Sequence, residues 1–315
     1  MTVRSWRPAG AVLLLALAGC AGDPSVPETV WGHKGVNDGE LVRPRAVAID
    51  RQDRLYVVDF TARVQVYDRD GKYLGKTWQT PDYRNGRPSG LSIDRAGNLL
   101  LSDSHYHCIR VYSPYPECKE LRVLGGEGGS GPGQLGYISD VVQDADGYYY
   151  VAEFGESHRI SKFDADFNFI KSWGETGIEP GQFGRIRALA IGPRDGLLYA
   201  DDATNHRFQV FTRDGALVRC WGESGSAPGQ LYCPYDFAFD SAGDLYVVEW
   251  GNQRVQKFTA TGEYLGGWGA PGGEPGCFNR PWGLAVDSRD RVHVLDTDNH
   301  RIQRFAPITP GGAAP

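Results

Sequence analysis

The sequence has little of what helical and nucleic-acid-binding proteins need. Outside the first twenty residues, no segment of the 315-residue chain repeats apolar side chains with a helical period, which excludes a helix bundle. Basic residues are in deficit, with 33 Lys and Arg against 39 Asp and Glu, and nucleic-acid binding draws its affinity from clustered basic groups. The Gly-x-Ser-x-Gly and His-Glu-x-x-His motifs of two hydrolase classes are also missing.

The one long apolar run lies at the start of the chain. Arg4 and Arg7 precede an apolar stretch that ends at Gly19, and this stretch is too short to span a bilayer. Leu17–Cys20 resembles a bacterial lipobox, so we expect a lipoprotein signal peptide at 1–19 and lipidation of Cys20; an ordinary signal with a chance cysteine is the alternative. Signal removal would change the formal net charge from −6 to −8.

The predicted cellular location follows from the same segment. Residues 20–27 are expected to be the lipidated cysteine and a short tether. Ala21 stands where retention in the inner membrane would favour aspartate, so in a two-membrane bacterium the resemblance favours the outer membrane. The chain is then exported and attached to the cell envelope through its N-terminal lipid alone.

Export to an oxidising compartment permits disulfides. Besides Cys20 there are five cysteines, an odd number that leaves at least one thiol without a partner inside the chain. Cys220 and Cys233 flank one short loop between two repeats, and we predict a disulfide between them. Closing such a loop would add about 3 kcal/mol to stability.

A repeat of about 47 residues fills the rest of the chain. Its clearest marker is a strand that ends in Trp-Gly or a related pair, and the central residues of the six copies are 47, 46, 49, 48 and 47 positions apart. A fixed period in this range indicates a propeller or a solenoid. Alternating apolar residues and glycine hairpins predict four antiparallel strands in each repeat.

The two ends of the chain predict how the ring closes. The last repeat stops after its third strand at Phe305, whereas a lone fourth strand, Val30-Trp31-Gly32, precedes the first repeat. We therefore expect the N-terminal strand to pair into the C-terminal blade, which would remove two open sheet edges.

The motifs of the repeat resemble NHL repeats. These motifs are a strand ending in Asp or Glu, then Asn-x-Arg-[Ile/Val/Phe]-Gln, and later Gly-x-Pro-Gly-Gln-[Leu/Phe]. The resemblance implies an all-β fold, a six-bladed β-propeller of four-stranded antiparallel blades over 28–308, followed by a disordered tail at 309–315. It says little about activity, because similar rings serve as RNA binders, protein scaffolds, sensors and a lyase.

Residues that recur in every blade are expected to belong to the scaffold. His107, His158, His206 and His300 share one repeat position on different blades and point away from one another, whereas metal ligands must converge. The acid that ends each second strand and the arginine that follows it are interpreted as a hydrogen-bonded pair. His105–Cys108 is a local cluster of ligand types, but zinc there would need a fourth group.

The mouth of the central channel is where the blades differ. The first residues of the six inner strands converge at one end of the axis, and aromatic residues follow the repeat acids of alternate blades. The predicted ligand-binding residues are Arg45, Ser89, Ser139, Arg187, Tyr235, Trp282, Phe60, Phe154 and Trp250. Two acids, Asp140 and Asp236, directly follow strand-start residues. The structural alternative to ligand binding is that Arg45 and Arg187 neutralise these two acids.

The amidating lyase that cleaves peptidyl-hydroxyglycine is distantly similar. Its zinc histidines occupy the strand-start positions, which hold no histidine here, so its zinc chemistry does not carry over. Asp140 and Asp236 match the aspartate that helps that lyase to hold a structural calcium in the channel. The resemblance therefore implies calcium as a cofactor, bound by Asp140 and Asp236.

Two functions follow as hypotheses. The first is a noncatalytic binding or scaffold module for a protein, peptide or glycan of the cell envelope, bound at the channel mouth. The alternative is a calcium-assisted lyase or lactonase-like hydrolase that uses Asp140, Asp236, Glu153 or Glu249, with Arg45 or Arg187 stabilising an oxyanion. A third reading, RNA binding, is disfavoured by the net charge and by export, and no nucleic-acid partner is predicted.

Overall fold

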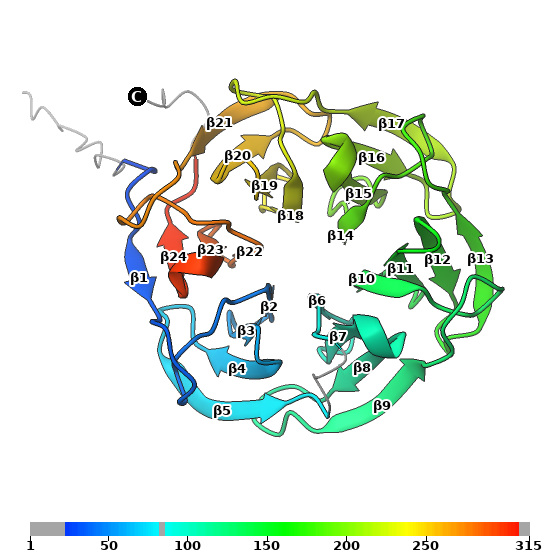
Figure 1. The fold of residues 1–315 in the computed structure, drawn as a ribbon, viewed down its shortest axis with the longest axis horizontal. Coiled ribbons are helices and arrows are strands. Elements are labelled where there is room, and N and C mark those ends of the chain that lie inside the picture. The colour runs from blue at the N-terminus through cyan, green and yellow to red at the C-terminus, as the bar shows by residue number, and fades with distance from the viewer. Residues whose placement is uncertain (1–22, 82–85, 309–315) are drawn as a thin grey trace, which may run out of the picture.

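The ring predicted from the repeat is present. A computed structural model describes residues 23–81 and 86–308, so the predictions for 1–19, Cys20 and 309–315 fall outside the described residues. Six four-stranded antiparallel sheets surround a central axis (Figure 1). Each sheet is one blade, with its first strand innermost and its fourth strand on the outer wall.

The first three blades run through β13. Blade 1 contains β2 (Ala46–Ile49), β3 (Leu55–Val58), β4 (Arg63–Tyr67) and β5 (Tyr73–Gln79). Blade 2 contains β6 (Gly90–Ile93), β7 (Leu99–Asp103), β8 (Cys108–Tyr112) and β9 (Glu120–Gly125). Blade 3 contains β10 (Tyr137–Gln143), β11 (Tyr149–Phe154), β12 (Arg159–Phe163) and β13 (Phe169–Trp173).

The last three blades complete the ring. Blade 4 contains β14 (Ile186–Ile191), β15 (Leu198–Asp202), β16 (Arg207–Phe211) and β17 (Leu217–Trp221). Blade 5 contains β18 (Pro234–Phe239), β19 (Leu245–Glu249), β20 (Arg254–Phe258) and β21 (Tyr264–Trp268). Blade 6 contains β22 (Leu284–Val286), β23 (Val292–Asp296), β24 (Arg301–Phe305) and, from the N-terminal side, β1 (Thr29–Trp31).

Closure of the ring occurs as predicted. Strand β1 pairs antiparallel with β24, with Thr29 opposite Arg304 and Trp31 opposite Ile302. The backbone pairing extends one residue further, because Glu28 N–H donates to the carbonyl of Arg304 at 2.7 Å. An ion pair between the same two side chains, 3.0 Å apart, holds the start of the closing strand.

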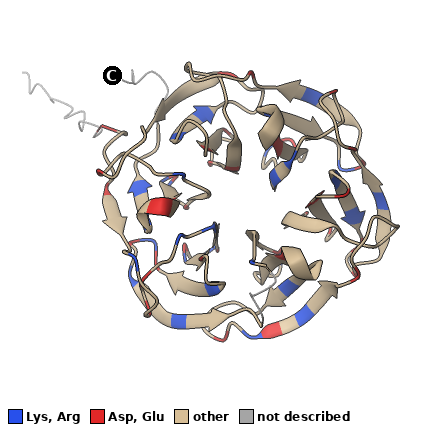
Figure 2. Cartoon of the chain, in the orientation of Figure 1, with Lys and Arg blue, Asp and Glu red and all other residues tan. Residues whose placement is uncertain are grey.

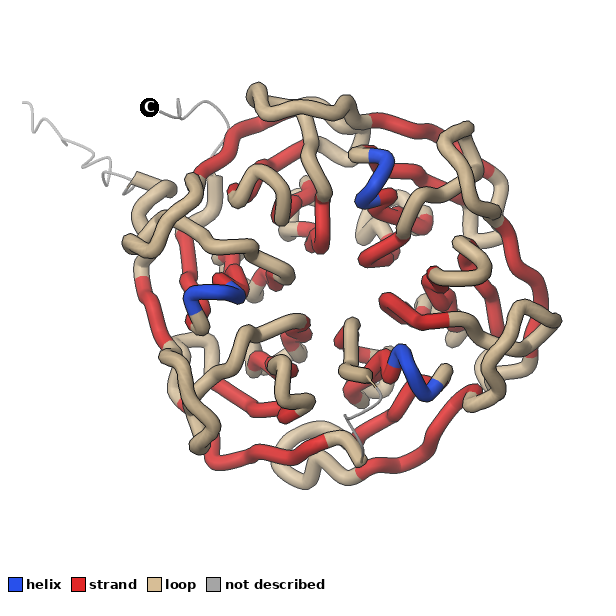
Figure 3. The backbone as a smooth tube through the Cα atoms, viewed as in Figure 1, coloured by secondary structure: helices blue, strands red, loops and turns tan. Residues whose placement is uncertain are grey.

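Three short 3-10 helices interrupt the strand pattern. They are η1 (Ser104–Tyr106), η2 (Ala203–Asn205) and η3 (Thr297–Asn299), which follow the second strands of blades 2, 4 and 6 (Figure 3). A histidine in the left-handed conformation ends each one. Within the described residues, no helix has the length and apolar character needed to cross a membrane.

The hydrophobic core lies between neighbouring blades. One cluster joins Tyr56 and Val64 of blade 1 to Leu99 and Leu101 of blade 2, and similar clusters occupy the other blade interfaces. Each blade therefore buries its two faces against its neighbours, as expected for repeats that cannot bury a core alone.

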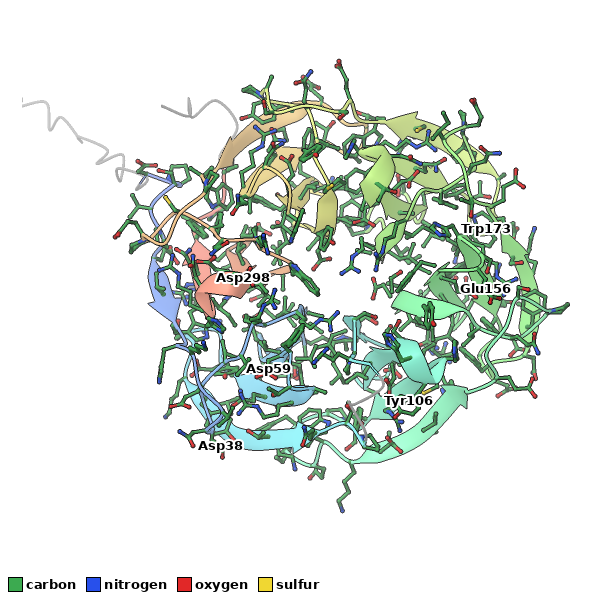
Figure 4. The ribbon with its side chains drawn as sticks, in the orientation of Figure 1. Asp38, Asp59, Tyr106, Glu156, Trp173 and Asp298 are labelled. Atoms are coloured by element: carbon green, nitrogen blue, oxygen red, sulfur yellow. The ribbon has the colours of Figure 1, made fainter. Side chains whose placement is uncertain are left out.

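The recurring tryptophan explains part of the repeat. Trp173 at the end of the outer strand of blade 3 packs over Gly215, which lies in the hairpin of blade 4 with φ of +83°. A side chain at Gly215 would meet the indole at 2.6 Å, so the glycine serves both the turn and the blade contact. Trp31 packs in the same way over Gly71 of blade 1 and so locks the closing strand. Trp173 lies toward the outer edge of the ring in Figure 4.

Candidate functional site

A cavity of about 200 Å³ occupies the central channel. Five of the six predicted strand-start residues line it: Arg45, Ser89, Arg187, Tyr235 and Trp282. Asp140 and Asp236 line it as well, next to small residues such as Ala46, Gly90 and Ala188. Side chains reach far into the centre of the ring, which looks open when only the ribbon is drawn (Figure 4). The structure therefore brings these five predicted residues together around one cavity.

Ser139 is an exception to this prediction. It is 1% exposed, and its hydroxyl donates to the carbonyl of Ala152 at 3.3 Å within the same blade. The reason is a β-bulge in β10 between Ile138 and Asp140, which breaks the regular register with β11. A bulge redirects the side chains around it, so Ser139 turns into the blade and Asp140 faces the channel.

Bulges shape the start of three consecutive inner strands. In β14 the register shifts between Ile186 and Leu189, and in β18 it shifts between Pro234 and Asp236. The inner strand of blade 1 pairs regularly from its first residue. The residues that distinguish the mouth on blades 3, 4 and 5 therefore lie on locally distorted backbone, a common setting for functional side chains.

Arginine guanidiniums form cation–π contacts with aromatic rings around the mouth. The guanidinium carbon of Arg45 lies 4.6 Å from the ring centre of Trp282, and that of Arg187 lies 5.4 Å from the same indole and 4.3 Å from Tyr235. Each such contact contributes about 0.5–2 kcal/mol, the larger value applying to desolvated sites.

The three aromatic residues predicted after the repeat acids extend this arrangement. Phe60 contacts the guanidiniums of Arg43, Arg45 and Arg87, with Arg87 nearest at 3.8 Å. Trp250 stacks on Tyr235 with ring centres 5.7 Å apart. Phe154 contacts Arg185 at 4.2 Å and packs at a tilt of 38° against Tyr137. Phe60 and Trp250 therefore contact residues that line the cavity. Phe154 instead contacts Arg185, two residues before the cavity-lining Arg187.

The two channel acids bind backbone amides of neighbouring blades. Asp140 of blade 3 accepts a hydrogen bond from Leu189 N–H of blade 4 at 2.9 Å, and Asp236 of blade 5 accepts one from Leu284 N–H of blade 6 at 3.0 Å. Neither forms an ion pair with Arg45 or Arg187 within the described chain, where arginines such as Arg254 do pair with acids. Direct ion pairing is therefore not formed among the described residues, although the charge of Arg187 acts to lower the pKa of both acids.

A third buried carboxyl, Asp201, holds the backbone of two residues that line the cavity, and the sequence reasoning missed it. Its Oδ1 accepts hydrogen bonds from the N–H groups of Arg187 and Ala188, both at 2.7 Å, whereas Oδ2 has no partner among the described residues. It precedes the repeat acid Asp202, a position that holds Val, Ser, Ala, Val and Leu in the other blades. The comparison between blades that singled out Asp140 would also have found Asp201 at this position.

Burial raises the pKa of Asp140, Asp236 and Asp201. Desolvation is the largest cause, and it raises the pKa of Asp140 to about 8 and that of Asp236 to about 7. For Asp201 it raises the pKa well above the ordinary value. Backbone hydrogen bonds act in the opposite direction on each acid but are outweighed. Near neutral pH the channel acids therefore carry less negative charge than three ordinary aspartates.

The arginines at the mouth are close enough to repel one another. Burial lowers the pKa of Arg45 to about 9, and Arg187, Arg87 and Arg43 add to the effect as like charges. The guanidinium still carries its charge at neutral pH. Arg43 is balanced by Asp298 at 2.7 Å, a residue of blade 6 labelled in Figure 4.

Three of the four recurring histidines form scaffold contacts, as predicted, whereas Nδ1 of His158 is buried without a partner among the described residues. His206 Nδ1 accepts a hydrogen bond from Cys233 N–H at 3.0 Å, and His300 Nδ1 accepts one from Arg43 N–H at 3.0 Å. His107 Nδ1 lies 2.9 Å from the carbonyl of Gly136. In each case the histidine joins one blade to the chain that leads into the next.

The repeat acids and arginines are also paired as predicted. Arg254 binds Glu249 at 2.6 Å and donates to the carbonyls of Ala227 and Gln230 in the preceding loop between blades. In blade 2, where Cys108 replaces the repeat arginine, Arg110 binds the acid Asp103 at 2.7 Å instead. Glu153 and Glu249 are therefore committed to ion pairs, which makes them poor candidates for the catalytic carboxylates considered from the sequence.

The predicted disulfide between Cys220 and Cys233 is absent, and both residues are free thiols. Cys220 lies on the outer strand β17, whereas Cys233 immediately precedes the inner strand β18 and donates its N–H to His206. The connecting loop spans the depth of a blade, so nearness in sequence does not bring the two sulfurs together.

No set of ligands suited to a metal is found within 23–81 and 86–308. Groups of three or more His, Cys, Asp or Glu side chains that could hold an ion are missing there, including at His105–Cys108. Both oxygens of Asp236 accept backbone hydrogen bonds, from Phe237 and Leu284. Calcium needs six to eight oxygen ligands, so binding at Asp140 and Asp236 would also need carbonyls or waters, and the calcium site stays a prediction.

Comparison with known proteins agrees with this architecture. The family model described as NHL repeat matches residues 231–258 and 278–305, which lie in blades 5 and 6. The chain is thus a six-bladed β-propeller in which blades 5 and 6 match the NHL-repeat model. Protein lin-41 of Caenorhabditis elegans is 39% identical to this chain over 51 residues, a segment that covers 16% of this chain and 4% of lin-41.

Solved structures with the same fold have diverse functions. A virginiamycin B lyase from Staphylococcus aureus matches 89% of this propeller and 99% of its own chain, with a TM-score of 0.63 and 12% identity. A gluconolactonase from Xanthomonas campestris matches 84% of this chain and 86% of its own, with a TM-score of 0.63 and 14% identity. The WD40 β-propeller domain of Doa1 matches 89% and 96%, with a TM-score of 0.59 and 15% identity. At these identities the likeness shows the fold alone.

Proposed function

We propose that this propeller is an exported, lipid-anchored and noncatalytic binding module for a protein, peptide or glycan of the cell envelope. The observation that carries the proposal is the cavity at the channel mouth, lined by the strand-start residues at which the blades differ. Concave sites with aromatic walls and a few polar groups are the usual form of ligand pockets. The lipid on Cys20 would hold the ring at the membrane surface and leave the mouth free to bind.

A binding role fits how the reactive side chains are used. His107, His206 and His300 join blades, and the repeat acids are held by arginines. The side chains at the mouth are chiefly arginines and aromatic rings, which recognise ligands through charge, hydrogen bonds and stacking. The same residues do not provide a nucleophile next to a base, the arrangement that covalent catalysis requires.

Replacement of Trp282 by alanine tests this role. We expect immobilised full-length chain to retain components of a detergent-solubilised envelope fraction, and Trp282→Ala to reduce that retention at least tenfold, because truncation of a central aromatic contact costs about 2 kcal/mol or more. Tyr148→Ala is the matched control, since Tyr148 is a partly exposed aromatic next to the β10–β11 hairpin at the opposite end of the ring. Equal retention by both variants, with melting temperatures unchanged, would contradict the proposal.

A lyase or lactonase-like hydrolase at the same cavity is the second candidate. The raised pKa of Asp140 and of Asp236 favours it, because carboxyls that titrate near neutral pH suit general acid and base catalysis. Elemental analysis and calcium titration of the purified chain separate the calcium-assisted form from simple binding. A stoichiometric divalent ion, or a melting temperature raised by calcium, would support the calcium-assisted enzyme over a simple binding module.

A further inference from the structure

Three arginines at the channel mouth form no ion pair within residues 23–81 and 86–308. The Nε atoms of Arg45, Arg185 and Arg187 are all buried and none has a hydrogen-bond partner among the described residues. By contrast, the repeat arginines Arg207, Arg254 and Arg301 are each bound to an acid and to loop carbonyls. These repeat guanidiniums are therefore held by acids and carbonyls, whereas the Nε atoms at the mouth are not.

The environment of these arginines increases the cost of leaving them unpaired. Arg187 is only 9% exposed, and it shares the indole of Trp282 with Arg45, so two like charges face the same ring. Buried charge is costly unless a partner compensates it. The aromatic contacts offset part of this cost but supply no hydrogen-bond acceptor for the guanidinium N–H groups.

The nearby carboxyls do not supply the missing acceptor. Asp140, Asp201 and Asp236 direct oxygens to backbone N–H groups. Burial raises the pKa of each, which reduces the negative charge they offer to the arginines. The mouth is thus a local concentration of positive charge in a chain whose formal net charge is −6. Figure 2 shows that Lys and Arg otherwise lie interspersed with Asp and Glu around the ring.

We propose that the channel mouth binds an oxyanion, a carboxylate or phosphate group of a small ligand, between the guanidiniums of Arg45 and Arg187. This proposal rests on the binding function proposed above and names the chemistry of its ligand. The planar fork of arginine matches both groups, which accept two hydrogen bonds at once. Arg185 lies at the edge of the same mouth, two residues from Arg187, and would add a third positive charge. The aromatic rings hold the arginine planes in place before the ligand arrives.

A small anion suits this site better than a nucleic acid. The cavity measures about 200 Å³, which admits one anionic group and its immediate substituents. A phosphate polymer would also have to lie against the remaining surface, where acidic residues outnumber basic ones.

Calorimetric titration of the purified full chain tests the proposal with named probes. Inorganic phosphate and trigalacturonate present phosphate and carboxylate oxyanions, and maltotriose is a neutral trisaccharide of similar size. We expect at least one anion to bind, and Arg45→Gln or Arg187→Gln to weaken that binding at least tenfold. Arg187→Lys, which keeps the charge but loses the fork, is expected to show an intermediate loss.

A matched arginine at the other end of the channel provides the control. Arg95 follows the inner strand β6 and is exposed, with its guanidinium near the carbonyl of Ala145. Arg95→Gln is expected to leave anion binding unchanged. Removal of one of two repelling charges is expected to leave the melting temperature of Arg187→Gln equal to or above that of the original chain, which separates loss of a ligand contact from loss of the fold.

The results separate the anion site from the broader binding role. If neither anion binds, or if Arg45→Gln and Arg187→Gln bind as tightly as the original chain, the oxyanion site is overturned. In that case Trp282-dependent retention of envelope components, or binding of maltotriose, would still support the binding module. Binding of an oligouridylate without either small anion would overturn the small-ligand proposal and indicate a nucleic-acid partner.

Discussion

At the scale of single residues, the channel acids show how one side-chain type serves two purposes. The repeat acids such as Glu249 lie beside arginines and stay paired. Asp140 lies where a small residue stands in most other blades, and it accepts a hydrogen bond from a backbone N–H of the next blade. It therefore joins two inner strands and also places a protonatable group in the channel.

The pKa of Asp140 predicts how stability changes with pH. An acid whose pKa is about 8 in the folded chain and 3.8 in the unfolded chain favours folding at low pH, and this contribution is lost as the pH rises from about 4 to 8. Asp140→Asn removes the ionisation, so the variant should be the more stable form at pH 8, by up to about 5 kcal/mol on the linkage relation. Denaturant unfolding measured from pH 4 to pH 8 gives the difference.

Asp236→Asn is the companion variant for that measurement. The pKa of Asp236 is about 7, so its effect should be complete at a lower pH than that of Asp140→Asn and should be smaller. Stability curves of the original chain and the Asp140 variant that run parallel across this range would show that Asp140 is not held in its protonated form.

At the scale of strands, each blade depends on its neighbour. Outer-strand tryptophans pack over the hairpin glycines of the next blade, and three histidines bind the chain that leads into it. Strand β1 provides the last of these contacts, because it fills the edge of β24 and brings Trp31 over Gly71. The ring therefore closes with the same contacts that join consecutive blades.

Removal of β1 should destabilise the whole ring. A chain that begins at His33 loses the strand pairing and the Trp31 contact. A packed tryptophan alone is worth about 3–5 kcal/mol, so we expect a fall in melting temperature on the order of 10 °C and aggregation through the exposed edge. Calorimetry and light scattering measure both effects. A chain that begins at Asp23 keeps β1 and is the control; equal melting of the two would mean that the closing strand is dispensable.

At the scale of the whole molecule, charge and attachment decide where the mouth can act. The chain is acidic overall yet has arginines at one end of its channel, so anionic ligands would be drawn to that end and repelled elsewhere. A lipid on Cys20 would reach the ring through a tether that ends at β1 on the outer wall, distant from the channel axis (Figure 1). The anchor and the mouth would therefore not compete for the same surface.

Lipidation predicts a simple change on substitution of the modified residue. Cys20→Ser removes the acylated thiol, so the exported chain should move from the membrane fraction to the soluble fraction. Fractionation of cells that express each form, with blotting for the chain, measures the shift. Cys277→Ser is the control because Cys277 lies in the ring as a free thiol. Retention of Cys20→Ser in the membrane fraction would show that another feature holds the protein there.

The sequence by itself determined the number of blades, the closure of the ring and the scaffold role of the recurring histidines, acids and arginines. These features are periodic, and they depend on contacts between residues at fixed spacing along the chain. It also identified most of the mouth, because strand-start positions converge in any ring of this kind. Blade 2 shows the limit of this reasoning, since Arg110 replaces a missing repeat arginine from a position that no motif marks.

Only the tertiary structure decided which side chains face the channel. The bulges in β10, β14 and β18 bury Ser139, bring Asp140 and Asp236 to the cavity and direct Asp201 to the backbone of β14. The depth of a blade separates Cys220 from Cys233. A bulge shifts the alternation of side chains by one residue, and the partner of each channel group comes from another blade, so neither effect is encoded in local spacing.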